Sequence, residues 1–141
     1  MSKVRDIIDG RDLYRVSETD SVEHVAKLMA SLHVGAILVL DGGELRGIFS
    51  ERDLMKRVVL ERLAPETTPV RDVMTKAVVS VDELAGLEEA MELMHSHNCR
   101  HLPVTRGSHV VGFLSMRDLM HFELARKTEE LHHMRSYIQG T

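Results

Sequence analysis

The stretch that decides the fold is Gly47-Ile48-Phe49-Ser50-Glu51-Arg52-Asp53-Leu54-Met55. The chain repeats it 65 residues later as Gly112-Phe113-Leu114-Ser115-Met116-Arg117-Asp118-Leu119-Met120. At this offset residues 16–57 align with residues 81–122 without a gap, and 14 of the 42 pairs are identical. An offset of 66 aligns Val4-Arg5-Asp6-Ile7 with Val70-Arg71-Asp72-Val73, so each repeat also has a short lead segment. Internal repetition of this kind indicates two copies of one structural unit.

Both repeats predict the same order of elements, β-α-β-β-α, from their hydrophobic periodicity and turn residues. In the first repeat we expect a strand at 13–16, a helix at 22–32 capped by Asp20 or Ser21, strands at 36–40 and 45–49 around a turn at 41–43, and a helix from 51 towards 63. In the second we expect a strand at 78–81, a helix at 84–97, strands at 101–105 and 110–114 around a turn at 106–108, and a helix from 116. The predicted fold class is therefore α/β (α+β).

A repeat of about sixty residues buries too little surface to be robust alone. We therefore expect the two repeats to pack face to face by pseudo-twofold symmetry, to share a core, and to leave a ligand cleft between them. The expected domains are 1–64 for the first repeat with its lead segment, 65–122 for the second, and 123–141 for a C-terminal helix. Pro65 and Pro69 in the link disfavour a continuous helix there.

The predicted C-terminal helix has no Gly or Pro from residue 122 to residue 138. Leu124, Leu131, Met134 and Ile138 form an apolar stripe along it. Two interpretations remain open: the stripe packs on the chain's own domain, or it docks on a partner or a second copy.

Composition narrows the class of protein. Of 141 residues, 43% are hydrophobic and 28% are charged, which suits one soluble, compact chain. The net charge is 18 − 22 = −4, so no global basic field for nucleic acid is expected. The sequence has neither an apolar run of about 20 residues for a membrane span nor the start of a signal peptide. The single Cys99 excludes an internal disulfide, and the expected compartment is the cytoplasm.

The repeated motif allows two compatible interpretations. Ser50 and Ser115 are good N-caps, and Asp53 and Asp118 lie three residues later, as in a capping box. The same helix N-terminus can also bind a phosphate, while the carboxylate accepts ribose hydroxyls. In that second interpretation the motif glycine lets a ligand approach the backbone closely.

The chain resembles a CBS-domain pair, also called a Bateman module, and is most similar to the short stand-alone bacterial pairs. The resemblance rests on the two Gly-h-h-Ser-x-x-Asp motifs, on the lead segments, and on Cys99-Arg100-His101-Leu102-Pro103-Val104. It covers about residues 1–122. It implies two β-α-β-β-α units with clefts that bind adenosine-containing ligands: AMP, ADP, ATP, NAD or S-adenosylmethionine. It also implies regulation of other proteins rather than catalysis.

The resemblance carries site residues with it. Asp53 and Asp118 are expected to hold ribose hydroxyls, and Ser50 and Ser115 to contact ribose or phosphate. Arg100 and His101 are expected to contact phosphate in the cleft with Ser50 and Asp53. The full nucleotide-binding set is Ser50, Arg52, Asp53, Arg100, His101, Pro103, Ser115, Arg117 and Asp118. The adenine slots are expected to be lined by strand backbone near Ala36-Ile37 and Leu102-Pro103, with side chains such as those of Ala26 and Met91.

The two clefts are not expected to be equal. At the counterparts of Arg100, His101 and Pro103 the first repeat has Gly35, Ala36 and Leu38. A phosphate-rich ligand is therefore expected to prefer the cleft that Arg100 and His101 face.

We thus expect a cytoplasmic regulatory module that binds AMP, ATP or NAD, is not an enzyme, and has no catalytic residues or catalytic cofactor. Its expected partners are an adenine nucleotide, a second copy in a homodimer and an unidentified regulated protein, but neither nucleic acid nor a membrane. One alternative is a metal-responsive protein using His95, His97, Cys99 and His101, of which His97 and Cys99 are the weak metal candidates. Another is a structural dimer with vestigial clefts.

Overall fold

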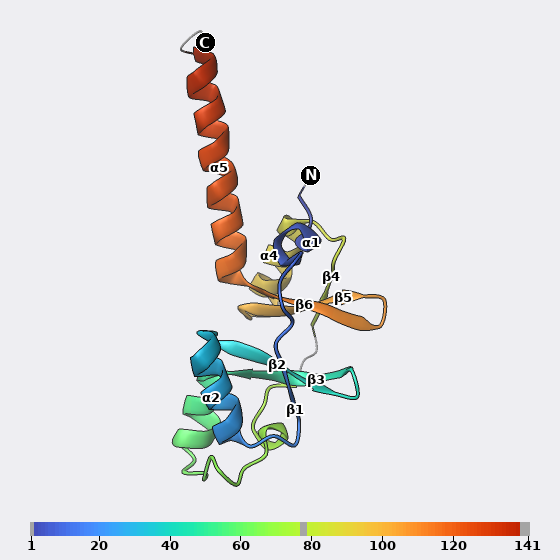
Figure 1. Cartoon of the computed structure of the whole chain (residues 1–141), viewed down its shortest axis with the longest axis vertical. Coiled ribbons are helices and arrows are strands. Elements are labelled where there is room, and N and C mark those ends of the chain that lie inside the picture. The colour runs from blue at the N-terminus through green and yellow to red at the C-terminus, as the bar shows by residue number, and fades with distance from the viewer. Residues whose placement is uncertain (1, 77–78, 139–141) are drawn as a thin grey trace.

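The computed structural model describes residues 2–76 and 79–138 of the chain (Figure 1). Its body contains two three-stranded sheets, in the orders β1-β2-β3 and β4-β5-β6. The strands are β1 (Arg15–Ser17), β2 (Ala36–Asp41), β3 (Glu44–Ser50), β4 (Val81–Asp82), β5 (His101–Arg106) and β6 (His109–Ser115). In each sheet the first pair of strands is parallel and the second is antiparallel. The predicted α/β fold with two equivalent repeats is confirmed.

Helices connect and cover these strands. They are α1 (Val4–Ile8), α2 (Val22–Leu32), α3 (Glu51–Asp53), the π-helical η1 (Leu54–Val59), the 3-10 turn η2 (Val70–Asp72), α4 (Leu87–Ser96) and α5 (Met116–Ile138). Ser21 is the N-cap of α2, because its side chain accepts the N–H of His24 at 3.1 Å. The predicted hairpin turns are also present, with Gly42, Gly43 and Gly107 at positive φ.

Two helices are shorter than the sequence predicts. The first was expected to run towards residue 63, but Arg62 adopts a φ of 56° and the N–H of Leu63 bonds back to the carbonyl of Val58 at 3.0 Å. This left-handed closure ends the helical segment. The helix expected from residue 84 begins at Leu87, because the Asp82 carboxylate accepts the N–H of Leu84 at 2.8 Å in a turn. The strand expected at 78–81 is shorter and later: residue 78 lies outside the described residues, Val79 and Ser80 are not in a strand, and β4 begins at Val81.

The lead segments exchange between the repeats. Val4, Ile7 and Ile8 of α1 belong to the core of the second repeat, where α1 lies beside β6 (Figure 1). Conversely, Val70, Val73 and Met74 belong to the core of the first repeat. The lead segment of the first repeat thus packs with the second repeat. The expectation of one shared core is wrong, because the buried residues form two clusters. The crossing segments tie the two repeats together instead.

The motif glycines make room for these crossing segments. A Cβ on Gly47 would lie 2.6 Å from the carbonyl oxygen of Thr75, and a Cβ on Gly112 would lie 2.5 Å from Cδ1 of Ile8. Such distances are far below van der Waals contact, so each glycine permits close backbone approach. The close neighbour of each glycine is the lead segment, and Gly112 also lines a cavity between the repeats.

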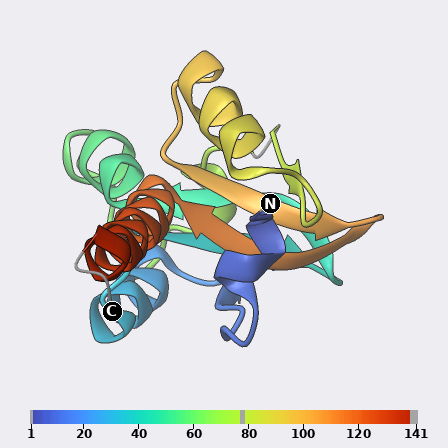
Figure 2. The ribbon, with the colours of Figure 1, turned by 90° about the horizontal axis from the view of Figure 1, so that it is seen from above.

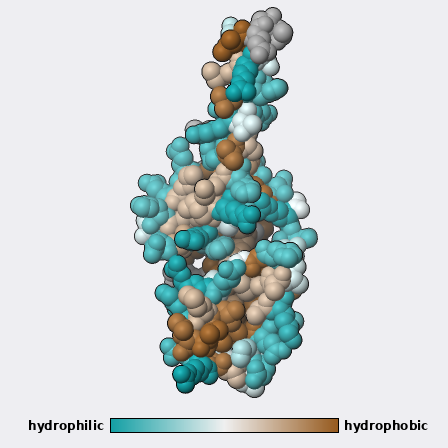
Figure 3. All heavy atoms as spheres, turned by 90° about the vertical axis from the view of Figure 1, so that its left-hand side faces the viewer, coloured by the Kyte–Doolittle hydropathy of each residue, from teal (hydrophilic) through white to brown (hydrophobic). Residues whose placement is uncertain are grey.

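Helix α5 is one continuous element of 23 residues, so the predicted segment from residue 123 is not separate from the second repeat. Leu119 is fully buried and Phe122 packs against the second core. The rest of the helix projects from the body, as Figures 1 and 2 show from two directions. The face of the molecule that carries α5 has apolar side chains along the helix and low on the body (Figure 3). Within the described residues, no helix has the length and apolar character needed to cross a membrane.

Candidate functional site

Each motif forms a capping box where a strand turns into a helix. The N–H of Ser50 donates to Oδ2 of Asp53 at 3.0 Å, and the N–H of Asp53 donates to Oγ of Ser50 at 3.2 Å. Ser115 and Asp118 repeat the pattern at 2.9 Å and 3.0 Å. The capping interpretation is confirmed at both motifs. It fixes each aspartate at a helix N-terminus, and the remaining carboxylate oxygen, Oδ1, is available for other contacts.

The carboxylate of Asp53 is committed to the protein itself, and this residue is only 6% exposed. Its Oδ1 accepts the hydroxyl of Thr75 at 2.9 Å, and its Oδ2 also accepts the hydroxyl of Ser50 at 3.0 Å. Nε of Arg57 lies 3.8 Å from Oδ1, while this guanidinium donates to the carbonyl of Met74 at 2.7 Å. The second lead segment therefore closes over Asp53.

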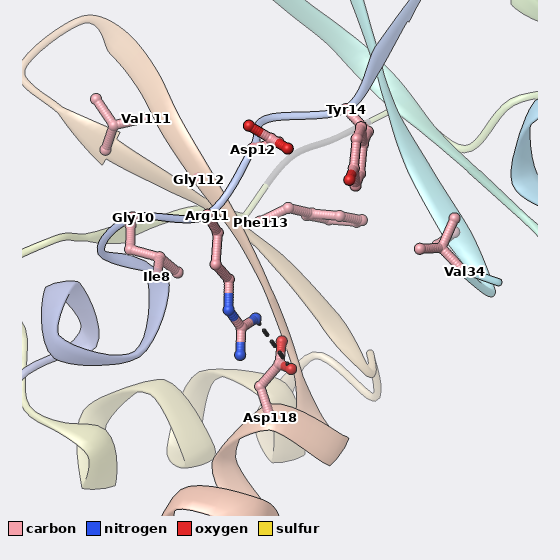
Figure 4. Close-up of a pocket in the computed structure, with 11 residues that line it drawn as sticks. Ile8, Gly10, Arg11, Asp12, Tyr14, Val34, Val111, Gly112, Phe113 and Asp118 are labelled. Carbon is pink, nitrogen blue, oxygen red and sulfur yellow. Dashed lines mark ion pairs between the residues drawn. The ribbon is translucent and has the colours of Figure 1, made fainter. Parts of the chain in front are cut away.

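The carboxylate of Asp118 is more open. Its side chain is 23% exposed, and its Oδ1 lies 3.0 Å from Nη1 of Arg11, whose side chain is 48% exposed. Figure 4 shows Arg11 reaching from the first lead segment to this aspartate. Ion pairs this accessible to water contribute about 1 kcal/mol or less. Asp118 and Arg11 are thus a carboxylate and a guanidinium that a ligand can separate at low cost.

A cavity of about 430 Å³ lies in front of Asp118. The first repeat supplies Val34 and Ala36, the segment after α1 supplies Arg11 and Tyr14, and β6 supplies Phe113. In Figure 4 the side chains of Tyr14 and Phe113 lie on the same side of Arg11. The volume is in the usual range for small-molecule sites, about 300–1000 Å³. The expected cleft between the repeats is present here.

The predicted site residues do not all reach this cavity. Asp118 and Ala36 line it, and Ser115 caps the helix beside it. Ser50 and Asp53 lie at the other motif, bonded to each other and to Thr75. The residues Arg52, Arg100 and Arg117 are exposed.

The strands expected to line the adenine slots with their backbone are buried. The side chains of Ile37 and Leu102 are 1% and 0% exposed and belong to the two hydrophobic cores, and Pro103 is buried as well. Their side chains point into packed interiors, so the expected role of the strand backbone there stays a prediction. Ala26 and Met91 are half-buried, and Met91 packs against the second core.

His101 stands behind the cavity wall. Its ring stacks on that of Phe113, with centroids 5.3 Å apart and an interplanar angle of 23°. Burial lowers the pKa of His101 below its ordinary value of 6.5, although the nearby carboxylates of Asp118 and Glu51 oppose that shift. The neutral imidazole is therefore favoured here. It supports Phe113 rather than offering the positive charge that the phosphate interpretation needs.

The geometry of the histidine-rich segment does not favour a metal site in the described part of the chain. In the part of the chain that the structure describes, no three His, Cys, Asp or Glu side chains gather in a way that could hold an ion. Nδ1 of His97 lies 3.1 Å from the carbonyl of Leu93, and His101 is stacked on Phe113. Burial raises the pKa of the Cys99 thiol, which disfavours the thiolate that a metal requires. The weak candidates His97 and Cys99 are not supported by this geometry.

Sequence reasoning missed Arg11, Tyr14 and Phe113. One signal was available: the lead segments align at an offset of 66 and the bodies at 65, so the segment between them differs by one residue. Arg11 and Tyr14 lie in that segment. The mismatch marks a place where the repeats cannot be equivalent, but it does not reveal which aspartate a side chain there would reach.

Comparison with known proteins identifies the family. The family model for the CBS domain matches residues 4–60 and 70–125. The protein YlbB of Bacillus subtilis is 36% identical over 132 residues, which cover 92% of this chain and 86% of YlbB. A candidate signal-transduction protein with CBS domains from Burkholderia ambifaria has a solved structure that is similar with a TM-score of 0.83. It is 37% identical, over 88% of this chain and 95% of that one.

A CBS domain protein from Pyrobaculum aerophilum, solved in complex with AMP, is similar with a TM-score of 0.76 at 26% identity. The match covers 83% of this chain and 89% of that one. Two family matches, one for each repeat, together span most of the sequence. The chain therefore belongs to the CBS domain family and is a pair of CBS domains.

Proposed function

We propose that this CBS pair is a regulatory module that binds an adenine nucleotide (AMP, ATP or NAD) in the cleft at Asp118. The observation that carries the proposal is the cavity of about 430 Å³ with the Arg11–Asp118 pair on its wall. The AMP complex of the Pyrobaculum aerophilum relative supports the choice of an adenine nucleotide.

The lining residues supply a group for each part of a nucleotide. The Asp118 carboxylate can accept both hydroxyls of a ribose, in hydrogen bonds strengthened by its charge. The Arg11 guanidinium suits a phosphate, whose oxygens match its planar set of donors. The rings of Tyr14 and Phe113 offer flat apolar surface to a base, and base stacking on such rings contributes about 1–3 kcal/mol.

Binding would break the Arg11–Asp118 contact and give each of the two side chains a group of the ligand as its new partner. A nucleotide gives Asp118 two hydroxyl donors and gives Arg11 a phosphate, so neither charge is left without a counterpart. A nucleoside has the hydroxyls but no phosphate, and it would separate Asp118 from Arg11 without compensating the guanidinium. We therefore expect AMP to bind more tightly than adenosine.

The Asp53 motif is the weaker candidate. A nucleotide there would first have to break the bond between Thr75 and Asp53, which is a contact inside the protein. The roles assigned to Ser50, Asp53, Arg100 and His101 therefore stay a prediction for a state in which the second lead segment has moved. In the present arrangement we expect the cleft at Asp118 to fill first.

A ligand in this cleft touches both repeats and a crossing segment at once. If two arrangements of these parts differ in affinity for the nucleotide, binding shifts the population between them. Such a shift, within one chain or between two copies, is the output that we propose. We therefore propose a regulatory role for the cleft rather than a catalytic one.

Titration calorimetry with AMP and with adenosine tests this function. The full chain is first freed of any nucleotide that copurifies with it. We expect AMP to bind at about one per chain and at least about 10-fold more tightly than adenosine, and Arg11→Gln to remove most of that difference. Failure of AMP, ATP and NAD to bind would leave the structural dimer with vestigial clefts as the better account. Equal affinity for AMP and adenosine would remove the proposed role of Arg11.

A further inference from the structure

The outer part of α5 leaves large apolar side chains in water. Past Phe122, which packs on the second core, Leu124 is 68% exposed, Leu131 55%, Met134 59% and Ile138 77%. This part of the helix projects from the body (Figures 1 and 3). A lone helix of about 15 residues is marginal in water. The projecting segment therefore needs a partner for this face if it is to be stable.

The exposed residues follow a heptad. Leu124, Leu131 and Ile138 are seven residues apart and occupy the a positions, while Met120, Lys127 and Met134 occupy the d positions. The buried residues Leu119 and Phe122 then fall at c and f, on the opposite side of the helix. The a/d stripe therefore points away from the body. A stripe of this period is the seam by which helices pair in coiled coils.

We propose that this stripe docks on the same stripe of a second copy, so that the two α5 helices form a parallel two-stranded coiled coil. Charge favours the parallel direction. Glu130 and Arg135 stand at g and at the following e position, five residues apart. In a parallel pair, g faces the following e of the other helix, so Glu130 of each copy meets Arg135 of the other. An antiparallel pair brings g to g instead, and Glu123 and Glu130 are both acidic.

The body gives a second reason for this arrangement. Met55 and Val59, which are 52% and 62% exposed, stand 65 residues before Met120 and Leu124, so the helical segments of both repeats expose equivalent apolar side chains. The segment around η1 and α5 lie on the same side of the molecule (Figures 1 and 2). An antiparallel dimer that sets α5 on η1 of the other copy would cover this region alone. The distal residues 131–138 have no counterpart in η1, so only pairing of α5 with α5 covers the stripe along its whole length.

Lys127 is the one charged residue among these exposed a and d positions from 120 to 138. A lone charged residue in such a seam lowers stability and limits the number of strands, because its ammonium group must reach water at the edge of the pair. This feature fits a dimer that dissociates and reforms better than a permanent bundle. Lys127→Leu is accordingly expected to strengthen association.

Sedimentation equilibrium of the full chain at about 50 μM, without nucleotide, tests the proposal. We expect the wild type to have the mass of a dimer, Leu131→Glu that of a monomer, and the matched control His132→Glu, one position off the stripe, that of a dimer. A monomeric wild type would overturn the proposal and point to a different partner for this face. A Leu131→Glu protein that stays dimeric would place the interface elsewhere.

Orientation has its own test. In a Cys99→Ser background, Leu131→Cys should form an intermolecular disulfide on mild oxidation, because identical a positions meet in a parallel pair. Glu130→Lys and Arg135→Glu should each weaken the dimer, and the double variant should restore it. Absence of the disulfide in a protein that is still dimeric would overturn the parallel arrangement. None of these outcomes depends on nucleotide binding, so they stand apart from the proposed function.

Discussion

Asp53 and Asp118 are the same residue in the same motif, yet they have different surroundings. Both accept the backbone N–H of a serine three residues earlier and begin a helix. Asp53 is 6% exposed and bonded to Thr75 of the second lead segment. Asp118 faces Arg11 of the first lead segment across the wall of a cavity. One aspartate thus holds the fold together, and the other is available to a ligand.

The difference comes from the crossing segments rather than from the motif. Each lead segment passes beneath the motif glycine of the opposite repeat, but one brings a hydroxyl to the aspartate and the other brings a guanidinium on a long side chain. A short hydroxyl contact closes the space in front of Asp53, whereas the long Arg11 side chain spans a space that stays open. Both repeats contain the same motif geometry. The crossing segments differ, and this leaves the motif at Asp118 open to a ligand and the motif at Asp53 closed.

The largest expected contrast is in stability after removal of each carboxylate. Asp53→Ala should lower the free energy of unfolding by about 2–4 kcal/mol, because it removes a cap and leaves the Thr75 and Ser50 hydroxyls without their acceptor. Asp118→Ala loses the cap and an exposed ion pair, for about 1 kcal/mol. Urea unfolding measures both values. Equal losses would contradict the distinction between the two motifs.

The motif glycines should differ in the same direction. Gly47→Ala places a Cβ against the backbone carbonyl of Thr75, which cannot move alone, and should cost about 1–3 kcal/mol. At Gly112 the nearest obstacle is the flexible end of Ile8, so Gly112→Ala should cost less than about 1 kcal/mol. Thermal unfolding of the two variants side by side provides the comparison. A costlier Gly112→Ala would show that the first lead segment is the more rigid one.

The two lead-segment partners give a smaller contrast. Thr75→Val keeps the shape of the side chain but removes the hydroxyl that Asp53 accepts, for a loss of about 1 kcal/mol in unfolding free energy. Arg11→Gln removes only an exposed ion pair and should change stability by less than about 0.5 kcal/mol. Chemical denaturation of both variants under the same conditions measures the difference between their unfolding free energies. A strongly destabilised Arg11→Gln protein would mean that this pair is structural too.

The smallest expected effect is a pH dependence at the wall of the Asp118 cleft. Because burial holds the pKa of folded His101 below 6.5, the unfolded chain takes up a proton first as the pH falls through that value. The free energy of unfolding contributed here is complete above pH 6.5 and declines below it. His101→Phe, which keeps a ring against Phe113, should lose less stability than the wild type between pH 7 and pH 5. Parallel pH profiles of the two proteins would contradict this assignment.

Much of the fold could be predicted from the sequence, because the repeat fixes two equal sets of elements and each strand or helix carries its own periodicity. The capping boxes of Ser50 with Asp53 and Ser115 with Asp118 were likewise local and predictable. The exchange of lead segments was not, since Val4 and Val70 look alike and either repeat could bury either one. The contacts of Gly47 and Gly112 with the lead segments depend on that exchange, so the sequence did not predict them.

The candidate site was predicted in part. Asp118 and Ala36 were found because the motif and its partner strand repeat, but Arg11 and Tyr14 lie where the repeats differ in length. Ile37 and Leu102 lie on strands, as expected, but whether their backbone is open to a ligand depends on packing that the sequence does not specify. The inequality of the clefts was expected from Arg100 and His101, yet the structure attributes it to Arg11 and Thr75.

The most direct test of the central claim is to titrate AMP into the wild type, Asp118→Asn and Asp53→Asn by calorimetry. Asparagine keeps the size of each side chain and one capping oxygen, so all three proteins should remain folded, which circular dichroism verifies. We predict that Asp118→Asn weakens AMP binding by about 10-fold or more, as expected for loss of charge-assisted bonds to ribose, and that Asp53→Asn stays within about twofold of the wild type. Unchanged affinity in Asp118→Asn, or a loss confined to Asp53→Asn, would contradict the division of roles between the two motifs.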